Sequence, residues 1–316
     1  MSTNGHVVVE DTYAEAFRSI FAEVLITARD RKWLDHAVHA ATGHASSTIM
    51  CDCEAGVDRY VGPGGDESYK TPDGRPGVLV QFHVPRFRKD RAGLLEKALL
   101  ARISQNVLTC PTTKCFGATD VEPYFKLGRK IAFFGDGFEH LQERFGRQMW
   151  IIPTMGGEFV IDRRFGYQDG IMGGNLWFMA TTEDAAILAA ERAVEATNAT
   201  PGVITTFPGG VASSASKAGS RYSFLFASTY EAYCPTLKNE LGDESRVPPA
   251  VNSIMEIIIN GRDLDAVRDA TMASIAAAST VPGMVRISAG NYGGRLGKSF
   301  IYLRPESATA AAAVSN

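Results

Sequence analysis

The chain contains 316 residues, of which 45% are hydrophobic and 21% are charged, as expected for a folded protein with two hydrophobic cores or one large core. Its net charge of −3 shows neither the basic surplus of a nucleic-acid binder nor the acidic surplus of a salt-adapted surface. No apolar run is long enough to span a bilayer, and the N-terminal residues lack the pattern of a signal peptide. We therefore expect a cytoplasmic protein that binds neither membranes nor nucleic acid.

The sequence has an odd number of cysteines, which in a reducing compartment are expected to be free thiols. Paired zinc knuckles usually have C-x2-C spacing, and neither the C-x-C nor the C-x4-C pattern of this chain provides it. Because of this spacing, we expect no metal site. No sequence signature links a histidine to a nucleophilic cysteine either. The cysteines are Cys51, Cys53, Cys110, Cys115 and Cys234.

The first half of the chain predicts alternating strands and helices. Runs of β-branched and apolar residues predict strands at 23–28, 47–51 and 78–84. Apolar residues at helical spacing predict helices at 31–41 and 89–108. A loop rich in Gly and Pro separates the second strand from the third.

The second half repeats this order as strand–helix–strand–strand–helix–strand, which is typical of a ferredoxin-like split βαβ unit with two helices on one face of a sheet. The predicted fold class is therefore α+β, with two ferredoxin-like lobes in one subunit. The second-half elements are strands at 175–180, 202–207, 255–260 and 284–288 and helices at 183–196 and 263–279.

A β-rich insertion is predicted between the two lobes, where it would extend a sheet or supply an oligomer contact. We expect the first lobe, with its β-rich extension, to cover residues 1–150 and the second lobe to cover 151–305. Residues 306–316 are mostly small or polar and are expected to form a disordered tail. The strand-like segments of the insertion are 130–134, 149–152 and 158–163.

Glu256 lies in the middle of a predicted strand, S-I-M-E-I-I-I-N-G-R, and shares its face with Ile254 and Ile258. A carboxylate on an apolar face is costly unless it is paired, and burial raises its pKa. Two interpretations stay open. Glu256 is either a structural acid, paired with a Lys or Arg or facing water at a sheet edge, or an acid placed for proton transfer.

Four loops rich in Gly or polar residues allow close approach to a ligand, at 51–56, 71–77, 207–217 and 289–298. The last loop lacks the spacing of a nucleotide P-loop and runs into a predicted strand, which argues against a nucleotide site. Its polar side chains either bind a ligand or form a solvated hairpin.

The loop T-P-D-G-R-P-G has the composition of a β-turn. Within it, Arg75 pairs either with an acidic ligand or with a surface acid. Thr112 and Thr113, which follow the second predicted helix, either face a cleft or satisfy the end of that helix.

Short motifs spread in order along residues 8–303 together indicate one family. They are E-D-T-Y-A-E-A-F (10–17), V-L-I-T (24–27), I-M-C and E-A-G (49–51, 54–56), T-P-D-G-R-P-G (71–77), L-L-A-R and V-L-T-C-P-T-T (99–102, 107–113), E-F-V-I-D and G-Y (158–162, 166–167), G-G-N (173–175), G-V-I-T-T-F-P-G-G (202–210), M-E-I-I-I-N-G (255–261) and A-G-N-Y-G-G-R-L-G-K (289–298). Through these motifs the chain is similar to the formylmethanofuran:tetrahydromethanopterin formyltransferases, especially the bacterial form that is a subunit of a formyltransferase/hydrolase complex. The family pattern C-P-A-E-A-G is changed here by Asp52 and Cys53, so the conformation of this loop is not carried over.

The resemblance implies two ferredoxin-like lobes, homo-oligomers and, for the bacterial form, companion subunits. It implies formyl transfer between N5 of tetrahydromethanopterin, or a dephospho analogue, and the amine of methanofuran or methylofuran, during the oxidation of formaldehyde to formate. Both carriers act as co-substrates, with no metal and no tightly bound cofactor. A different interpretation stays open, in which the chain is a non-catalytic subunit that docks the carriers.

The resemblance also implies a mechanism. Glu256 matches the acid of the family's mechanism, which would exchange protons with the attacking and leaving amines. Backbone amides near Cys51–Glu54, those of the Asn291–Gly294 loop, or the Asn291 side chain would stabilise the oxyanion of the tetrahedral intermediate.

Phe207 and Tyr292 are candidates for flat walls that contact the carrier rings, and Lys217, Arg295 and Lys298 are candidates for binding an acidic tail. The predicted catalytic residues are Glu256, Cys51 and Glu54, and the predicted substrate-binding residues are Phe207, Pro208, Gly209, Gly210, Lys217, Asn291, Tyr292, Gly293, Gly294, Arg295, Lys298, Asp73, Arg75, Thr112 and Thr113.

Overall fold

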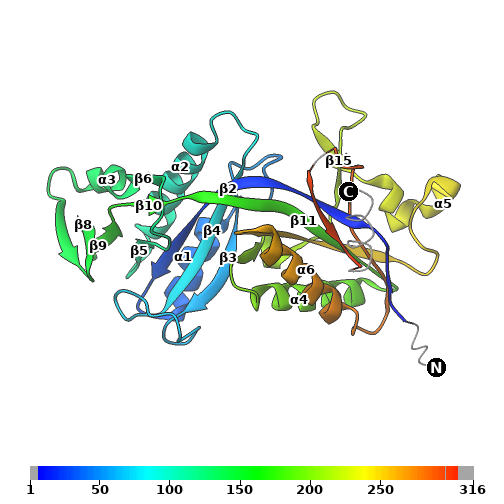
Figure 1. Cartoon of the computed structure of the whole chain (residues 1–316), viewed down its shortest axis with the longest axis horizontal. Coiled ribbons are helices and arrows are strands. Elements are labelled where there is room, and N and C mark those ends of the chain that lie inside the picture. Colours follow the sequence, from blue (N-terminus) through cyan, green and yellow to red (C-terminus); the bar gives the residue numbers. More distant parts are fainter. Residues whose placement is uncertain (1–5, 296, 305–316) are drawn as a thin grey trace, which may run out of the picture. The chain divides into compact units, whose positions relative to one another are not determined.

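The computed structural model describes residues 6–295 and 297–304, and the chain divides into two compact units. We call Arg18–Gly170 the central unit, and Met1–Phe17 together with Ile171–Asn316 the terminal unit. Two long strands, β2 (Tyr13–Thr27) and β11 (Gln168–Ala180), contribute residues to both units (Figure 1). The fold class is α+β, as predicted from the sequence. The strands form both parallel and antiparallel pairs.

The central unit is built on an antiparallel sheet with the strand order β5–β2–β4–β3. Alternate residues of β2, including Ala22, Val24 and Ile26, point into a core formed with two helices. The first helix begins after Asp30, whose side chain accepts a hydrogen bond from the amide of Trp33. The elements are α1 (Arg31–Thr42), β3 (Glu54–Val61), β4 (Gly77–Pro85), α2 (Arg91–Arg102), a π-helix (Ile103–Val107) and β5 (Lys114–Gly117).

The strand predicted at 47–51 is wrong, because this segment forms a turn and the strand begins only at Glu54. The amide of Cys51 donates to the carbonyl of Ser47 at 2.8 Å. The amide and hydroxyl of Thr48 donate to the Glu54 carboxylate at 3.0 and 3.2 Å. Local side-chain hydrogen bonds therefore outweigh the β-propensity of the short apolar run.

The β-rich insertion extends the sheet of the central unit, since β9 pairs in parallel with β5. The strand predicted at 130–134 is wrong, because α3 and a 3-10 turn occupy this segment. Leu127 and Ile131 lie one helical turn apart and are both buried, so the apolar spacing is helical. The elements are β6 (Tyr124–Phe125), α3 (Leu127–Ala132), a 3-10 turn (Phe133–Gly135), β7 (His140–Arg144), β8 (Arg147–Thr154), β9 (Gly157–Asp162) and β10 (Phe165–Gly166).

The terminal unit has an antiparallel sheet with the order β17–β11–β16, and both β12 and β13 pair with the other edge of β16. Helices α4 and α6 lie side by side (Figure 1). Small side chains on α4 allow this close approach, and Thr197 and Ser274 join the helices through a hydroxyl–hydroxyl contact of 2.9 Å. The elements are α4 (Glu183–Asn198), β12 (Val203–Thr205), β13 (Val211–Ala212), β16 (Ser253–Gly261), α6 (Leu264–Ala278) and β17 (Met284–Ser288).

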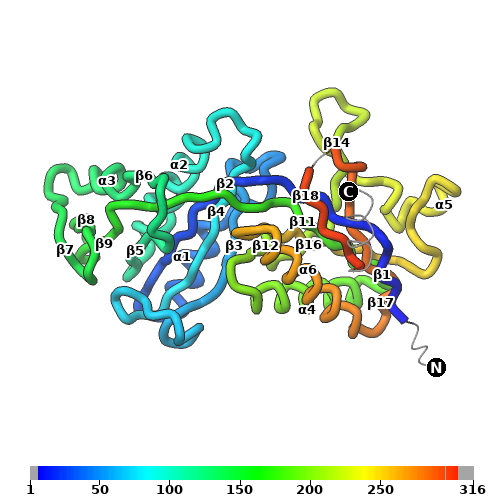
Figure 2. Tube along the Cα trace, in the orientation of Figure 1, coloured from blue at the N-terminus to red at the C-terminus, as the bar shows by residue number. Residues whose placement is uncertain are grey.

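Both ends of the described chain add strands to this unit. β1 (Val8–Val9) pairs in parallel with β17, and β18 (Ser299–Tyr302) runs beside the start of β2 (Figure 2). The tail predicted at 306–316 lies outside the described residues. No helix within residues 6–295 and 297–304 has the length and apolar character needed to cross a membrane.

The segment between β13 and β16, for which the sequence predicted no elements, forms a hairpin followed by short helical turns. The hairpin consists of β14 (Ser216–Ala218) and β15 (Ala227–Thr229). The turns are Glu231–Tyr233, Pro235–Leu237, α5 (Lys238–Leu241) and Gly242–Glu244.

Candidate active site

Glu256 lies in β16 and is 8% exposed. It is paired in register with Trp177 of β11 on one side and with Ala212 of β13 on the other. No ion pair among the described residues includes Glu256. The acid is therefore neither solvated nor held by a Lys or Arg in this part of the chain.

Two neutral donors hold one oxygen of Glu256. Asn175 Nδ2 and Trp177 Nε1 each donate to Glu256 Oε1 at 2.9 Å, and no hydrogen bond to Oε2 is present within the described residues. Burial raises the pKa of the Glu256 carboxyl, and the hydrogen bonds from Asn175 and Trp177 offset part of that rise. The result is a desolvated acid with one oxygen fixed.

Sequence reasoning missed Asn175 and Trp177. Trp177 is 3% exposed, and its ring makes edge-to-face contacts with Tyr230 and Tyr233 at centroid distances of 5.9 and 4.6 Å. A signal was present, because the alternation N-L-W places two side-chain N–H donors on one face of a strand. Only the register between β11 and β16 shows that this face is the one shared with Glu256.

Residues 207–210, at the start of the predicted loop, connect β12 to β13. Both strands pair with the same edge of β16, and in β13 Ala212 is the partner of Glu256. Phe207 has a φ of 70° and is half-buried, whereas Pro208 and Gly209 are exposed. A Cβ on Gly210 would lie 2.5 Å from Thr205 Oγ1, so this position needs glycine. The backbone donors of the turn are partly used, since the Gly210 amide bonds to the Phe207 carbonyl at 3.0 Å.

The predicted loop after β17 is largely bonded to its own surroundings. We call residues 290–295 and 297–298 the Gly290 loop. The Asn291 side chain donates to Thr12 Oγ1 at 2.9 Å, and the amides of Tyr292 and Gly294 donate to Glu15. Three of the expected oxyanion donors therefore already have partners.

The cations predicted to bind an acidic tail also have local partners. Arg295 Nε donates to the Tyr292 carbonyl at 3.0 Å, and Lys298 Nζ donates to the Gly294 carbonyl at 2.7 Å. Lys217 forms an ion pair with Glu231, which lowers the pKa of that carboxyl. All three cations lie in the terminal unit with Glu256, but none is bonded to it.

Tyr292 links the Gly290 loop to the hairpin, because its hydroxyl donates to the carbonyl of Ser216 at 2.9 Å. Burial is the main cause that raises the pKa of the Tyr292 phenol, with Glu256 among the nearby charges that add to it. Gly293 is exposed, with a φ of 65° and open space beside it.

Cys51 and Glu54 belong to the central unit. Cys51 lies in the turn before β3, where its sulfur is 3.9 Å from Ser46 Oγ. Glu54 is 6% exposed, and its carboxylate is used by Thr48. This geometry shows a structural use for Glu54. All five cysteines are free thiols.

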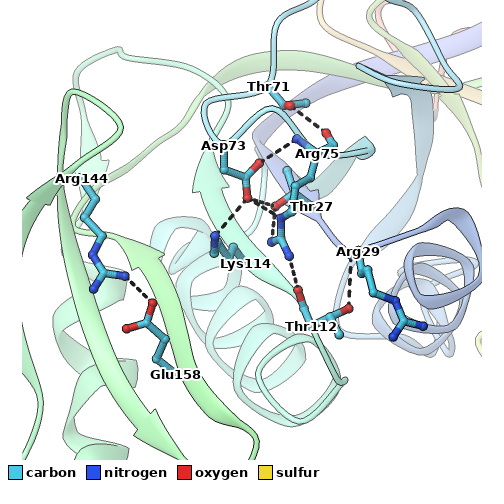
Figure 3. A network of polar contacts seen from close by, with 9 residues as sticks. All are labelled: Thr27, Arg29, Thr71, Asp73, Arg75, Thr112, Lys114, Arg144 and Glu158. Atoms are coloured by element: carbon cyan, nitrogen blue, oxygen red, sulfur yellow. Dashed lines mark hydrogen bonds and ion pairs between the residues drawn. The ribbon is translucent and has the colours of Figure 1, made fainter.

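Three further predicted residues, Asp73, Arg75 and Thr112, belong to a network in the central unit (Figure 3). Asp73, with its side chain 1% exposed, accepts from Arg75 Nε at 2.7 Å and from Thr27 Oγ1 at 2.9 Å. Lys114 Nζ lies 3.5 Å from the same carboxylate. Arg75 also donates to the Thr112 carbonyl at 2.7 Å. Arg75 therefore pairs with an acid of the protein, although this carboxylate is buried and not at the surface as expected.

Thr113 satisfies a helix end, which was one of its two predicted roles. Its hydroxyl donates to the carbonyl of Val107 at 2.6 Å and lies 3.0 Å from that of Cys110. Thr112 has a φ of 70°, and its hydroxyl accepts from the Arg29 amide at 3.3 Å. Both residues are thus bonded within the central unit.

A cavity of about 340 Å³ lies in the insertion of the central unit. It is lined by Arg147, Arg163 and Arg164, together with the acids Asp120 and Asp162. None of the predicted site residues lines it. No group of three or more His, Cys, Asp or Glu side chains suited to a metal ion occurs in the described part of the chain.

Comparisons with known proteins agree with the motif resemblance. The family model described as "Formylmethanofuran-tetrahydromethanopterin formyltransferase" matches residues 1–154, and the model "FTR, proximal lobe" matches 157–305. The chain is 46% identical over 309 residues to a formylmethanofuran–tetrahydromethanopterin formyltransferase of Methanocaldococcus jannaschii, covering 96% of this chain and 99% of the relative. It is 45% identical to the Archaeoglobus fulgidus protein of the same name, with the same coverage.

Two solved structures are also similar. One is the formylmethanofuran:tetrahydromethanopterin formyltransferase from Methanosarcina barkeri, with a TM-score of 0.87, 44% identity, and coverage of 96% of this chain and 99% of that chain. The other is a chain of the formyltransferase/hydrolase complex from Methylorubrum extorquens in complex with methylofuran, with a TM-score of 0.85, 38% identity, and coverage of 94% and 95%. The chain is therefore a transferase that belongs to the formylmethanofuran–tetrahydromethanopterin formyltransferase family.

Proposed function

We propose that this chain transfers a formyl group between N5 of tetrahydromethanopterin, or a dephospho analogue, and the amine of a methanofuran or methylofuran carrier, in the oxidation of formaldehyde to formate. Family membership supports the reaction. The observation that carries the mechanism is the environment of Glu256, which is buried and bonded through Oε1 to two neutral donors. Both carriers act as co-substrates that bind and leave, with no tightly bound cofactor.

The proton path follows from this environment. The attacking amine forms a C–N bond to the formyl carbon and gives a tetrahedral intermediate, and its N–H proton passes to the Glu256 carboxylate through Oε2. The same proton then passes to the leaving nitrogen as its bond to carbon breaks, which restores the carboxylate. An acid whose pKa is raised toward neutrality suits both steps, because it must accept and return one proton in each turnover.

Oxyanion stabilisation needs donors that the fold does not already use. In the Gly290 loop, the amide of Gly293 makes no hydrogen bond within the described residues, whereas Tyr292 and Gly294 donate to Glu15. We assign the Gly293 amide as the donor that this loop offers. Phe207 and Tyr292 remain the proposed ring walls, and Lys217, Arg295 and Lys298 remain the proposed cations. Asp73, Arg75, Thr112 and Thr113 remain predicted binding residues, as do Asn291, Gly294 and the Pro208–Gly210 turn. Cys51 and Glu54 remain predicted catalytic residues.

Glu256→Gln is the direct test of the mechanism. The amide keeps the size of the side chain but cannot accept and return a proton. Transfer between the two carriers, followed spectroscopically with saturating substrates, is expected to fall about 100- to 10,000-fold. Glu195→Gln, at an exposed residue of α4 that pairs with Arg192, is the matched control and is expected to keep full turnover. Undiminished transfer by Glu256→Gln would contradict the acid–base role.

We also propose that the chain assembles with companion subunits and with copies of itself. The relative from Methylorubrum extorquens is part of a formyltransferase/hydrolase complex. Exposed aromatic residues between β14 and β15, including Phe224 at 75% and Phe226 at 82%, provide an apolar surface suited to such contacts. Light scattering of the purified chain checks self-association, and a monomer at micromolar concentration would contradict it. Formyl transfer by the isolated chain separates an enzyme from a carrier-docking subunit.

We propose that each unit is a ferredoxin-like lobe. The antiparallel orders β5–β2–β4–β3 and β17–β11–β16–β12, each with a helix after its first and third strand in sequence, support this proposal. The predicted division near residue 150 remains a prediction about folding units, which limited proteolysis tests. The cytoplasmic location likewise remains a proposal, which fractionation of cells tests.

A further inference from the structure

Glu15 is a buried acid that binds the backbone of the Gly290 loop. It lies in β2, is 2% exposed and is paired in register with Phe300 of β18. Its Oε1 accepts hydrogen bonds from the amides of Tyr292 at 2.5 Å and Gly294 at 2.7 Å, and its Oε2 accepts from the Gly297 amide at 3.1 Å. Hydrogen bonds to a charged acceptor are stronger than those between neutral groups. Glu15 therefore fixes three points of a loop that contains four glycines.

The two ends of this loop pack closely against neighbouring groups. A Cβ on Gly297 would lie 2.2 Å from the carbonyl oxygen of Ala16, so this end rests on the strand that carries Glu15. A Cβ on Gly290 would lie 2.8 Å from Asn175 Nδ2 and 2.8 Å from Trp177 Cζ2. The other end of the loop therefore rests on the two side chains that donate to Glu256.

These contacts connect Glu15 to Glu256 in three steps. Glu15 holds the amides of the Gly290 loop, Gly290 backs Asn175 and Trp177, and these two side chains hold Glu256 Oε1. We propose that Glu15 is a positioning residue for formyl transfer, which keeps the Gly290 loop in place and through it keeps both donors on Glu256. This inference rests on the proposed role of Glu256.

Glu15→Gln weakens this connection with little change in volume. The glutamine oxygen can still accept from Tyr292 and Gly294, but its NH2 group replaces the oxygen that accepts from Gly297. Two donors then face each other, so that end of the loop loses its bond. We expect the amides of Tyr292, Gly294 and Gly297 to exchange their hydrogens with solvent about tenfold faster, as measured by hydrogen exchange without carriers.

The fluorescence of Trp177 can show whether a change at Glu15 reaches Glu256. In a Trp33→Phe, Trp150→Phe background Trp177 is the remaining tryptophan of the chain, and its indole N–H contacts Glu256. Its fluorescence is expected to titrate with the Glu256 carboxyl, and Glu256→Gln in this background is expected to abolish that titration. Glu15→Gln is expected to raise the midpoint by about one pH unit, because donors displaced from the carboxylate no longer stabilise its charged form. The kcat is expected to fall roughly 10- to 100-fold through misplacement of the acid.

Glu10→Gln is the matched control for a purely structural role. Glu10 also joins the N-terminal segment to the C-terminal part of the chain, but it accepts from the side chains of Arg286 and Ser288 and not from the Gly290 loop. We expect it to leave the loop exchange, the Trp177 midpoint and kcat unchanged. If Glu15→Gln and Glu10→Gln behaved alike in all three measurements, the positioning role would be overturned.

Gly290→Ala provides a second route should Glu15→Gln fail to fold. Its new methyl group meets Asn175 and Trp177 directly while Glu15 stays intact. A shifted Trp177 midpoint with reduced kcat supports the connection, and wild-type values for both overturn it. If Glu256→Gln kept full turnover, the proposed function of Glu256 would fail, whereas loop exchange and Trp177 fluorescence would still decide whether Glu15 holds the loop.

Discussion

Asp73 and Glu256 are both buried carboxylates, but their partners differ in kind. Asp73 lies beside two cations, Arg75 and Lys114, and also accepts from the Thr27 hydroxyl (Figure 3). Glu256 accepts only from the neutral groups of Asn175 and Trp177 within the described residues, and both bonds use one oxygen.

This difference separates a structural acid from one that can exchange a proton. The cations beside Asp73 offset the cost of burying its charge, as in a structural ion pair. Burial without a cation favours the neutral form, and it raises the pKa of the Glu256 carboxyl above its ordinary value. The sequence left both interpretations open for Glu256, and the absence of a bonded cation among the described residues favours proton transfer.

The largest expected effect is at Glu256, where activity and stability should separate. Glu256→Gln removes proton transfer, for an expected loss of about 100- to 10,000-fold in kcat. The amide keeps the volume and can still accept from Asn175 and Trp177, so the free energy of unfolding is expected to stay within about 1 kcal/mol of wild type. Urea denaturation beside the transfer assay checks both. A large loss of stability would place Glu256 with Asp73, as a structural acid.

Asp73→Asn should show the opposite pattern to Glu256→Gln. It leaves Arg75 and Lys114 without their carboxylate, so the free energy of unfolding is expected to fall by roughly 2–3 kcal/mol, as when a hydrogen bond to a charged group is lost. Glu158→Gln is the matched control, because Glu158 pairs with Arg144 at a more exposed site and is expected to cost less than about 1 kcal/mol. Equal costs for the two variants would show that the burial of Asp73 contributes nothing.

A smaller effect is expected from a change at Trp177, because it alters the pKa of Glu256 but leaves the carboxyl in place. Trp177→Phe keeps an aromatic ring against Tyr233 but removes a donor to the carboxylate. The pKa of Glu256 should rise, so the acidic limb of the kcat profile is expected to move upward by about half to one pH unit. Trp150→Phe is the control, since Trp150 Nε1 is buried without a hydrogen-bond partner among the described residues. An unmoved limb in Trp177→Phe would show that this hydrogen bond does not set the pKa.

Patterns along the chain predicted most of the elements that carry the site. Periodicity placed β16, α4, α6 and β17 within a few residues of their observed bounds. Periodicity gave the wrong structure at 47–51 and 130–134, because a short apolar run can form either a strand or a helical or turn segment. There, Thr48 bonding to Glu54 and the helical spacing of Leu127 and Ile131 decide the outcome.

The hydrogen-bond partners of the site residues could not be predicted from the sequence. Asn175 and Trp177 lie about 80 positions before Glu256, and only the register of β11 with β16 brings them together. Glu15 lies still further from the Gly290 loop that it holds. Such pairings depend on strand order and register, whereas sequence periodicity reports only which face of an element is apolar.

Glu256 is proposed to be a buried acid that holds and releases a proton in each turnover. Carbon-13 NMR of protein labelled at glutamate side-chain carboxyls, with Glu256→Gln to assign the resonance, follows its titration directly. We expect a midpoint above the ordinary value of 4.5, because burial disfavours the carboxylate and no bonded cation among the described residues restores it. A midpoint at or below 4.5 would show a permanently ionised carboxylate and would contradict the proton-transfer role.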